Sequence, residues 1–279
     1  LKLIFSSDGQ KIFGAQIIGE DGADKRIDTI ATAISLGGSI YNLKDLELAY
    51  APPYSSAKDP VNMLGFMAEN IIQKKVKLAK WNSVSPSDSG EYTILDIREN
   101  AELMVFDMPD SIHIPLGQLR NRLSMLNKND KIIIFCGIGV RSYNAARILN
   151  ENGFENVWVY PAGTSFYRAV YYHHFNDAPF TPDISIENHA EDTSDDIKAA
   201  IQVDCSGLQC PGPIMKVYET VNNLNNGDII QVSATDSGFS KDVEAWCRRT
   251  GNTLLKVEKE GKKSIVYLQK GISQIKSDS

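Results

Sequence analysis

The central third of the sequence alternates short apolar runs with amphipathic segments, and this order restricts the possible folds more than any other feature. The apolar runs are residues 93–97, 131–135 and 157–160, and residues 116–126 and 142–152 between them have helical spacing. Two strands joined by a helix usually pair in parallel, because the helix carries the chain back to the edge of the sheet where the first strand began. A tight turn would instead make the second strand antiparallel to the first. The pattern therefore predicts an α/β domain with a parallel sheet, over residues 79–176.

The segment that precedes this domain combines a hairpin with helices. Two apolar runs flank the turn sequence Ser-Ser-Asp-Gly-Gln and predict antiparallel strands at residues 2–5 and 12–18. Periodic apolar residues and the Asp59-Pro60 helix start predict helices at residues 24–36, 45–48 and 60–75. We expect an α+β domain over residues 1–78.

A polar stretch separates the last segment from the central one. Residues 177–200 are polar and rich in Asp, and they predict a linker. Four strands and two helices are then expected, at residues 202–205, 211–224, 228–234, 239–250, 254–259 and 264–269. Residues 201–271 are therefore predicted to form a two-layer α/β sandwich.

Composition excludes several classes of function. The chain has 279 residues and a formal net charge of -6, so no overall positive field attracts nucleic acid or anionic lipid. No apolar run approaches the roughly 20 residues that cross a bilayer, and we expect a cytoplasmic protein. Its four cysteines are too sparse for a disulfide scaffold, and the four histidines lack the spacing of metal ligands, so we expect no bound metal.

The turn after residues 131–135 has the chemistry of an anion-binding loop. Cys136-Gly-Ile-Gly-Val-Arg141 joins this strand to a helix that begins near Ser142. Helix N-termini and nearby cations favour the thiolate form of a cysteine. Two glycines let several backbone N–H groups point inward, and Arg141 adds a cation. The loop predicts a nucleophilic cysteine, although a lone cysteine is more commonly an inert small hydrophobe.

The motif Cys-x-x-Gly-x-Arg-Ser after an apolar strand resembles the active-site loop of rhodanese domains. Residues 93–99, 112–119 and 152–157 follow the order of that family. The resemblance implies that Cys136 accepts a sulfane sulfur as a persulfide and that Arg141 binds the substrate. The remaining loop residues would line the substrate site: Gly137, Ile138, Gly139, Val140 and Ser142.

The length of this loop and its departures from the family bear on the chemistry. The loop spans six residues, whereas related folds that act on phosphate esters have one residue more, so sulfur transfer is favoured. The usual Gly-His-Ile-Pro-Gly and Gly-Gly-x-x-x-Trp sequences appear here as residues 109–113 and 162–167. We expect these departures to affect packing more than the loop. Asp96 and Arg98 are interpreted as a structural ion pair.

A second cysteine motif lies in the last segment. Cys210-Pro-Gly-Pro resembles the Cys-Pro-x-Pro signature of TusA-like (SirA-like) sulfur carriers, over about residues 203–270. The resemblance implies that Cys210 is the carrier thiol and makes Cys205 a possible resolving thiol. Cys247 is as well explained by packing as by chemistry. The basic residues of this segment lack interleaved aromatic platforms and indicate a solvated face, not a nucleic-acid site: Lys241, Arg248, Arg249, Lys256, Lys259, Lys262 and Lys263.

The first segment resembles the dimerisation domain of coenzyme A-disulfide reductases and NADH oxidases. The resemblance rests on residues 14–19, 22–28 and 48–55. It implies a longer polypeptide whose upstream domains bind FAD, NAD(P)H and coenzyme A, whereas no cofactor is expected to bind to this chain alone. It also implies a homodimer, in which Tyr50 and Tyr54 are candidates for contact with the partner subunit.

Together these features predict a sulfurtransferase with a rhodanese-type parallel-sheet domain between a dimerisation domain and a TusA-like sandwich. A Cys136 persulfide would take sulfur from a small-molecule donor such as thiosulfate or a polysulfide, and Cys210 is the candidate second carrier. In the intact protein this activity would serve a flavin-dependent disulfide or persulfide reductase. The alternative is a non-catalytic dimeric scaffold with a sulfur-carrier or regulatory module.

Overall fold

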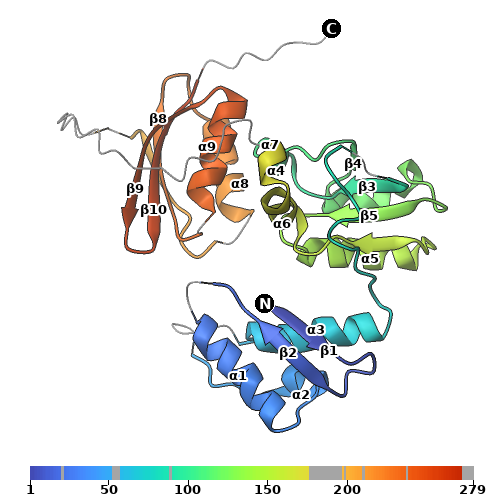
Figure 1. The fold of residues 1–279 in the computed structure, drawn as a ribbon. Helices are drawn as coiled ribbons and strands as arrows, with labels where there is room; N and C mark the ends of the chain where they lie inside the picture. Colours follow the sequence, from blue (N-terminus) through green and yellow to red (C-terminus); the bar gives the residue numbers. More distant parts are fainter. Residues whose placement is uncertain are drawn as a thin grey trace. The chain divides into compact units, whose positions relative to one another are not determined.

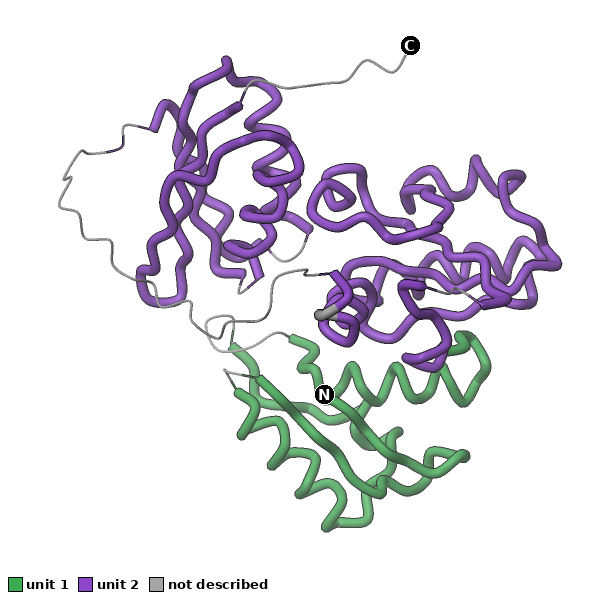
Figure 2. The backbone as a smooth tube through the Cα atoms, turned by 45° about the horizontal axis from the view of Figure 1, so that its top comes forward, with its two compact units in different colours: residues 1–78 green, residues 79–279 purple. Residues whose placement is uncertain are grey.

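The computed structural model describes residues 1–19, 22–51, 57–87, 90–175, 197, 199–208, 211–236 and 238–271. The chain forms two compact units, residues 1–78 and 79–279 (Figure 2). Of the predicted linker 177–200, only residues 197, 199 and 200 are among those described. No helix in the described parts of the chain is long and apolar enough to span a membrane.

The first unit packs three helices against a hairpin (Figure 1). Strands β1 (Lys2–Phe5) and β2 (Ile12–Gln16) pair antiparallel, as the apolar runs predict. The helices are α1 (Ala23–Ser35), α2 (Ile40–Asp45) and α3 (Pro60–Ile72). Alternation along the strands points one hairpin face at the helices. The buried core comprises Ile12, Ile30, Ile40, Leu43, Val61 and Ala68.

The predicted helix at residues 45–48 is wrong, because α2 lies earlier and ends at Asp45. A capping box between Ser39 and Asn42 starts α2, and Leu46 is already extended. The side-chain amide of Asn62, on α3, donates to the carbonyl oxygens of residues 43, 44 and 46, at 3.0–3.3 Å. The end of α2 is thus satisfied by another helix, which a local pattern does not reveal.

The second unit contains a parallel sheet of the order β4-β3-β5-β6, which confirms the predicted parallel sheet. Its strands are β3 (Tyr92–Asp96), β4 (Ser111–His113), β5 (Lys131–Phe135) and β6 (Val157–Val159). Its α-helices are α4 (Asn100–Leu103), α5 (Val140–Glu151), α6 (Gly163–Val170) and α7 (Tyr172–Phe175). Strand β5 is central and almost wholly buried.

The predicted helix at residues 116–126 consists of two 3₁₀ helices, η1 (Leu116–Asn121) and η2 (Leu123–Met125). The backbone of Arg122 has φ −119° and interrupts the run. Strand β4 and helices α4, α6 and α7 were not predicted, because each is short and takes its place from contacts with the sheet.

The same unit holds a second, mixed sheet of the order β7-β8-β10-β9. Its strands are β7 (Ile201–Asp204), β8 (Ile229–Ala234), β9 (Thr253–Glu260) and β10 (Lys263–Gln269). Helices α8 (Gly212–Asn222) and α9 (Phe239–Thr250) cover one face of this sheet (Figure 1). Every second residue of β8 is buried. The predicted two-layer α/β sandwich is confirmed.

Candidate functional site

Cys136 lies directly after β5, where the central strand turns into α5. The side chain is fully buried, and the backbone N–H of Gly139 donates to its Sγ at 3.0 Å. Gly139 has φ 106°, a conformation that favours glycine, and this residue caps α5. The strand, turn and helix that the sequence predicts around Cys136 are therefore present, with one backbone donor at the thiol.

The other loop residues differ in exposure. Gly137 is buried, whereas the side chains of Ile138 and Val140 are 48% and 64% exposed. Ser142 is fully buried, and its hydroxyl has no hydrogen-bond partner among the described residues. A buried hydroxyl without a partner is unusual in a folded protein. The roles that the sequence assigns to these residues stay predictions.

The start of helix α6 bonds to the backbone of the Cys136 loop. The N–H groups of Thr164 and Ser165 donate to the carbonyl oxygens of Cys136 and Gly137 at 2.8 and 3.1 Å. A Cβ on Gly163 would lie 2.1 Å from the Cys136 carbonyl oxygen, so only glycine fits there. These bonds come from backbone groups, and the expectation that the departures at residues 162–167 affect packing more than the loop stays a prediction.

Aromatic side chains pack under the strand that ends at Cys136. The ring of Phe135 stacks on Tyr160, with centroids 4.4 Å apart, and meets Tyr167 edge-on at 5.5 Å. Burial raises the pKa of Tyr160 to about 12, and its hydroxyl donates to the Trp81 carbonyl. Burial also raises the pKa of Tyr167. These phenols stay protonated at neutral pH and support the strand by packing.

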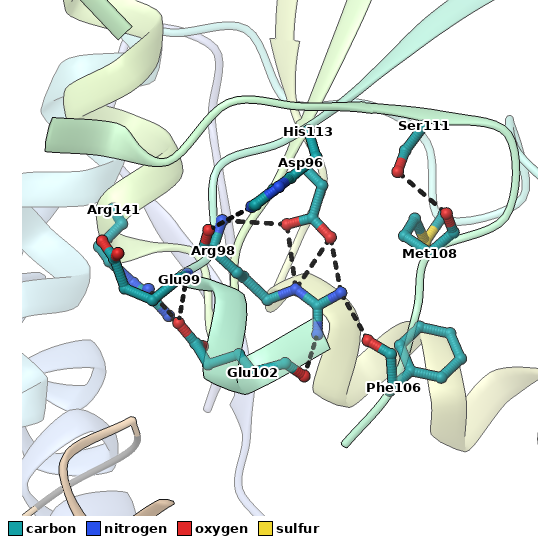
Figure 3. A network of polar contacts seen from close by, with 9 residues as sticks. All are labelled: Asp96, Arg98, Glu99, Glu102, Phe106, Met108, Ser111, His113 and Arg141. Atoms are coloured by element: carbon teal, nitrogen blue, oxygen red, sulfur yellow. Dashed lines mark hydrogen bonds and ion pairs between the residues drawn. The ribbon is translucent and has the colours of Figure 1, made fainter. Parts of the chain in front are cut away.

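Arg141, the predicted substrate-binding cation, is held by Glu102 of α4. Its two terminal nitrogens donate to the two carboxylate oxygens of Glu102, both at 2.6 Å (Figure 3). The Glu102 side chain is 5% exposed and the Arg141 side chain 21%. A bidentate pair of this kind fixes the guanidinium and offsets its charge. The loop cation is therefore oriented by a carboxylate that the sequence analysis missed.

Glu102 is itself positioned by the start of its own helix, α4. Its carboxylate accepts the N–H of Glu99 at 2.9 Å, in a capping box at the start of α4. Glu three residues after an N-cap position is a known sequence signal, and it could have identified this residue. Here the N-cap is Glu99, which is not among the preferred capping residues, and so the signal was weak.

The Asp96–Arg98 pair, interpreted as structural, is a buried ion pair (Figure 3). The Asp96 carboxylate accepts hydrogen bonds from both Nε and Nη2 of Arg98, at 3.0 and 2.6 Å. Arg98 also donates to the Phe106 carbonyl at 2.8 Å and to the Glu102 carbonyl at 3.4 Å. Arg98 therefore ties the segment that carries Glu102 to the end of strand β3.

The remaining cysteines lie in the second sheet domain. Cys205 is fully buried, and burial raises its pKa, with a further contribution from Asp204. Cys247 lies buried on α9, and burial raises its pKa to about 12. Cys210, the predicted carrier thiol, lies outside the described residues. The resolving role of Cys205 stays a prediction, and it requires the buried thiol to become accessible.

The cross-subunit candidates are only partly described. Tyr50 is 51% exposed, and Tyr54 lies outside the described residues.

Cys136 thus lies at the carboxyl end of the central parallel strand, with one turn amide bonded to its sulfur, an arrangement typical of sites with a thiol nucleophile. Three family models match the chain in this order. Residues 1–60 match the pyridine nucleotide-disulphide oxidoreductase dimerisation domain, residues 84–169 the rhodanese-like domain, and residues 201–270 sulfurtransferase TusA.

Curated relatives support these matches. The sulfur carrier protein TusA of Allochromatium vinosum is 39% identical over 69 residues, which are 25% of this chain and 91% of that protein. A putative sulfur carrier protein of Aquifex aeolicus is 41% identical over 76 residues, 27% of this chain and 39% of that protein. The chain belongs, through residues 201–270, to the TusA family, and it joins this domain to a rhodanese-like domain and a dimerisation domain.

Two solved structures resemble a larger part of the chain. The CoADR-RHD protein of Bacillus anthracis is 45% identical with a TM-score of 0.57, over 60% of this chain and 30% of that one. An NAD-dependent persulfide reductase from A. fulgidus is 36% identical with a TM-score of 0.51, over 59% and 29%. The chain therefore spans less than a third of either solved protein.

Proposed function

We propose that the chain transfers sulfane sulfur through a persulfide on Cys136. The thiolate attacks the outer sulfur of a donor such as thiosulfate, the new S–S bond forms, and the donor's S–S bond breaks to release sulfite. A thiol acceptor then attacks the outer sulfur of the persulfide, and Cys136 leaves as a thiolate. Sulfur moves without an external oxidant or reductant, since each step exchanges one S–S bond for another.

The observation that carries this proposal is the geometry of the Cys136 loop. The Gly139 N–H already donates to the sulfur, and the buried Ser142 hydroxyl has no partner. A persulfide adds one atom and keeps the negative charge, so an amide that donates to the sulfur stabilises it. The match of residues 84–169 to the rhodanese-like domain supports the same chemistry.

The second step of the proposal passes the sulfur to Cys210. The support for it is that one chain contains both a rhodanese-like and a TusA domain. Attack of the Cys210 thiol on the outer sulfur would give a Cys210 persulfide and return Cys136 to its thiol form, with the proton moving from one thiol to the other.

The whole protein would act in the cytoplasm as an FAD- and NAD(P)H-dependent disulfide or persulfide reductase, with coenzyme A or a polysulfide in its substrate. This part rests on the names of the similar structures, a CoADR-RHD protein and a persulfide reductase. The cofactors would bind outside the described residues. We also propose a homodimer through residues 1–60, whose hairpin leaves Ile4 and Phe13 more than half exposed.

The test is the intact mass after treatment with thiosulfate or polysulfide. A one-sulfur adduct that cyanide removes as thiocyanate is expected on the wild type and on Cys210→Ser, but not on Cys136→Ser. Absence of an adduct from the wild type would contradict the proposal. It would favour the alternative of a dimeric scaffold with a sulfur-carrier or regulatory domain, which the complete burial of Cys136 supports.

A further inference from the structure

The TusA domain contacts the rhodanese-like domain at a defined place in the second unit. Helix α4 packs against α8, and Met104 and Val105, directly after α4, pack against the buried core cluster of the TusA domain. Partly buried apolar side chains that extend the core of a neighbouring domain are typical of a docking surface.

A charged pair lies beside this apolar contact. Arg168 of α6 donates to the carboxylate of Asp242, on α9, at 3.5 Å. Burial raises the pKa of Asp242, while Arg168 acts to lower it. The guanidinium of Arg168 also lies over the ring of Phe106, 5.4 Å from its centre. The pair and the apolar contact therefore meet in the segment that follows α4.

Both elements that contact the TusA domain also fix the Cys136 loop. Helix α4 provides Glu102, which holds Arg141. Helix α6 begins with the N–H groups that bond to the Cys136 and Gly137 carbonyls. Helices α4 and α6 thus hold the Cys136 loop on one side and contact the TusA domain on the other.

On the other side, Asp242 lies near the start of α8. A small cavity is lined by Pro211, Pro213, Ile214, Asp236, Phe239 and Asp242. In the sequence, Pro211 follows the predicted carrier thiol Cys210 directly. The surface that faces the rhodanese-like domain is therefore the end of the TusA domain that carries the sulfur-carrier motif.

We propose that Met104, Val105 and Arg168 form an intramolecular docking surface that holds the chain's own TusA domain for sulfur transfer, with Asp242 as the partner of Arg168. The inference rests on the proposed persulfide at Cys136 and names its acceptor as the tethered carrier domain. Docking raises the local concentration of the acceptor above what the covalent connection alone provides.

The experiment uses the full chain and thiosulfate labelled in its outer sulfur. The label on the Cys136 and Cys210 peptides is followed over time in the wild type, Arg168→Glu, Asp242→Arg and the double variant. We expect each single variant to load Cys136 at the wild-type rate and to label Cys210 about tenfold more slowly, since like charges then face each other. The double variant restores the opposite charges and should label Cys210 within about threefold of the wild-type rate.

A matched control separates docking from a general charge effect. Arg147 on α5 is 36% exposed, like Arg168, but pairs with Glu151 on its own helix. Arg147→Glu should leave the labelling of Cys210 unchanged. Single variants that label Cys210 at the wild-type rate would overturn the proposal, and so would a double variant as slow as the single ones.

Hydrogen exchange tests the docking independently of sulfur chemistry. Peptides that cover residues 100–106 and 239–250 should exchange faster in Arg168→Glu than in the wild type or the Arg147→Glu control. Unchanged exchange would refute the docking surface even if Cys136 carries no sulfur. Absence of label from Cys136 in the wild type would instead refute the proposed function.

Discussion

Gly163 lies so close to the Cys136 loop that no side chain fits between them. Its φ is 61°, and a Cβ would approach the carbonyl oxygens of Cys136 and Gly137 to 2.1 and 2.7 Å. At this scale the site depends on backbone contacts, which no property of Cys136 itself would reveal.

Gly163→Ala should therefore lower the free energy of unfolding of the second unit by about 3 kcal/mol, through overpacking and backbone strain. It should also slow persulfide formation on Cys136. Chemical unfolding and the rate of adduct formation measure the two effects. Gly117→Ala is the control, because a Cβ there meets no atom within 4 Å. Equal stability of the two variants would show that the Cys136 loop can move away from an added Cβ at position 163 without cost.

The bidentate pair between Glu102 and Arg141 makes a prediction about donor choice. Glu102→Gln keeps the shape and an acceptor for the Glu99 N–H but removes the charge that offsets Arg141. The KM for thiosulfate should fall about tenfold, as expected for one charge-assisted hydrogen bond. Reaction with an uncharged organic trisulfide should not change. A similar change for both donors would assign Glu102 a purely structural role; Glu151→Gln is the control for loss of an exposed carboxylate.

At the scale of elements, the first unit depends on the close approach of α2 and α3. The Asn62 amide satisfies three carbonyl oxygens at the end of α2, and its own carbonyl accepts the Asp59 N–H at 3.1 Å. A Cβ on Gly65 would lie 2.5 Å from the backbone nitrogen of Lys44, so α3 needs glycine where it meets α2.

Asn62→Ala should lower the free energy of unfolding of the first unit by about 2 kcal/mol, because it leaves buried carbonyl groups without a donor. Urea unfolding followed by circular dichroism measures the change. Asn70→Ala, on the same helix, should change the stability by less than about 0.5 kcal/mol. If the two variants are equally stable, the end of α2 is satisfied by water instead.

Helix α9 buries the Cys247 thiol, and the raised pKa makes a prediction about reactivity. The pKa of about 12, against an ordinary 9.0, reduces the thiolate fraction at pH 8 about a thousandfold. In the native protein, alkylation of Cys247 by iodoacetamide should be slower by at least this factor, and the rate should still rise with pH above 9. Peptide mapping measures it, with the urea-unfolded protein as the control. Fast native labelling would contradict the packing role of Cys247.

At the scale of the whole molecule, the predicted assembly concerns the hairpin of the first unit. Its inner side chains pack on the helices, whereas Phe13 remains 59% exposed. An exposed aromatic side chain on a segment that matches the dimerisation-domain model favours a subunit contact.

Phe13→Glu should weaken the proposed homodimer about a hundredfold or more, because it places a charge in a buried apolar contact. Sedimentation equilibrium over a range of concentrations measures the dissociation constant. Val257→Glu, at a 43% exposed position on β9, should leave it unchanged. A monomeric wild type, or a dimer that tolerates Phe13→Glu, would show that the hairpin is not the interface.

The sequence by itself determined the order of the domains and the local structure around Cys136. Alternating apolar periods encode strands such as β5 and helices such as α5 and α9, and the strand-turn-helix sequence around Cys136 encodes the loop. These features are local, and so each segment of sequence contains the information for its own structure.

The tertiary structure decided which distant groups meet at that loop. Glu102 reaches Arg141 across 39 positions of sequence, and α6 bonds to the Cys136 carbonyl although its residues depart from the family pattern. The elements α4 and α6 are short, and their stability comes from contacts with the sheet and the loop. The local sequence therefore gives only a weak helix signal for them. A contact between distant segments depends on the path of the whole chain, and a local pattern therefore does not specify it.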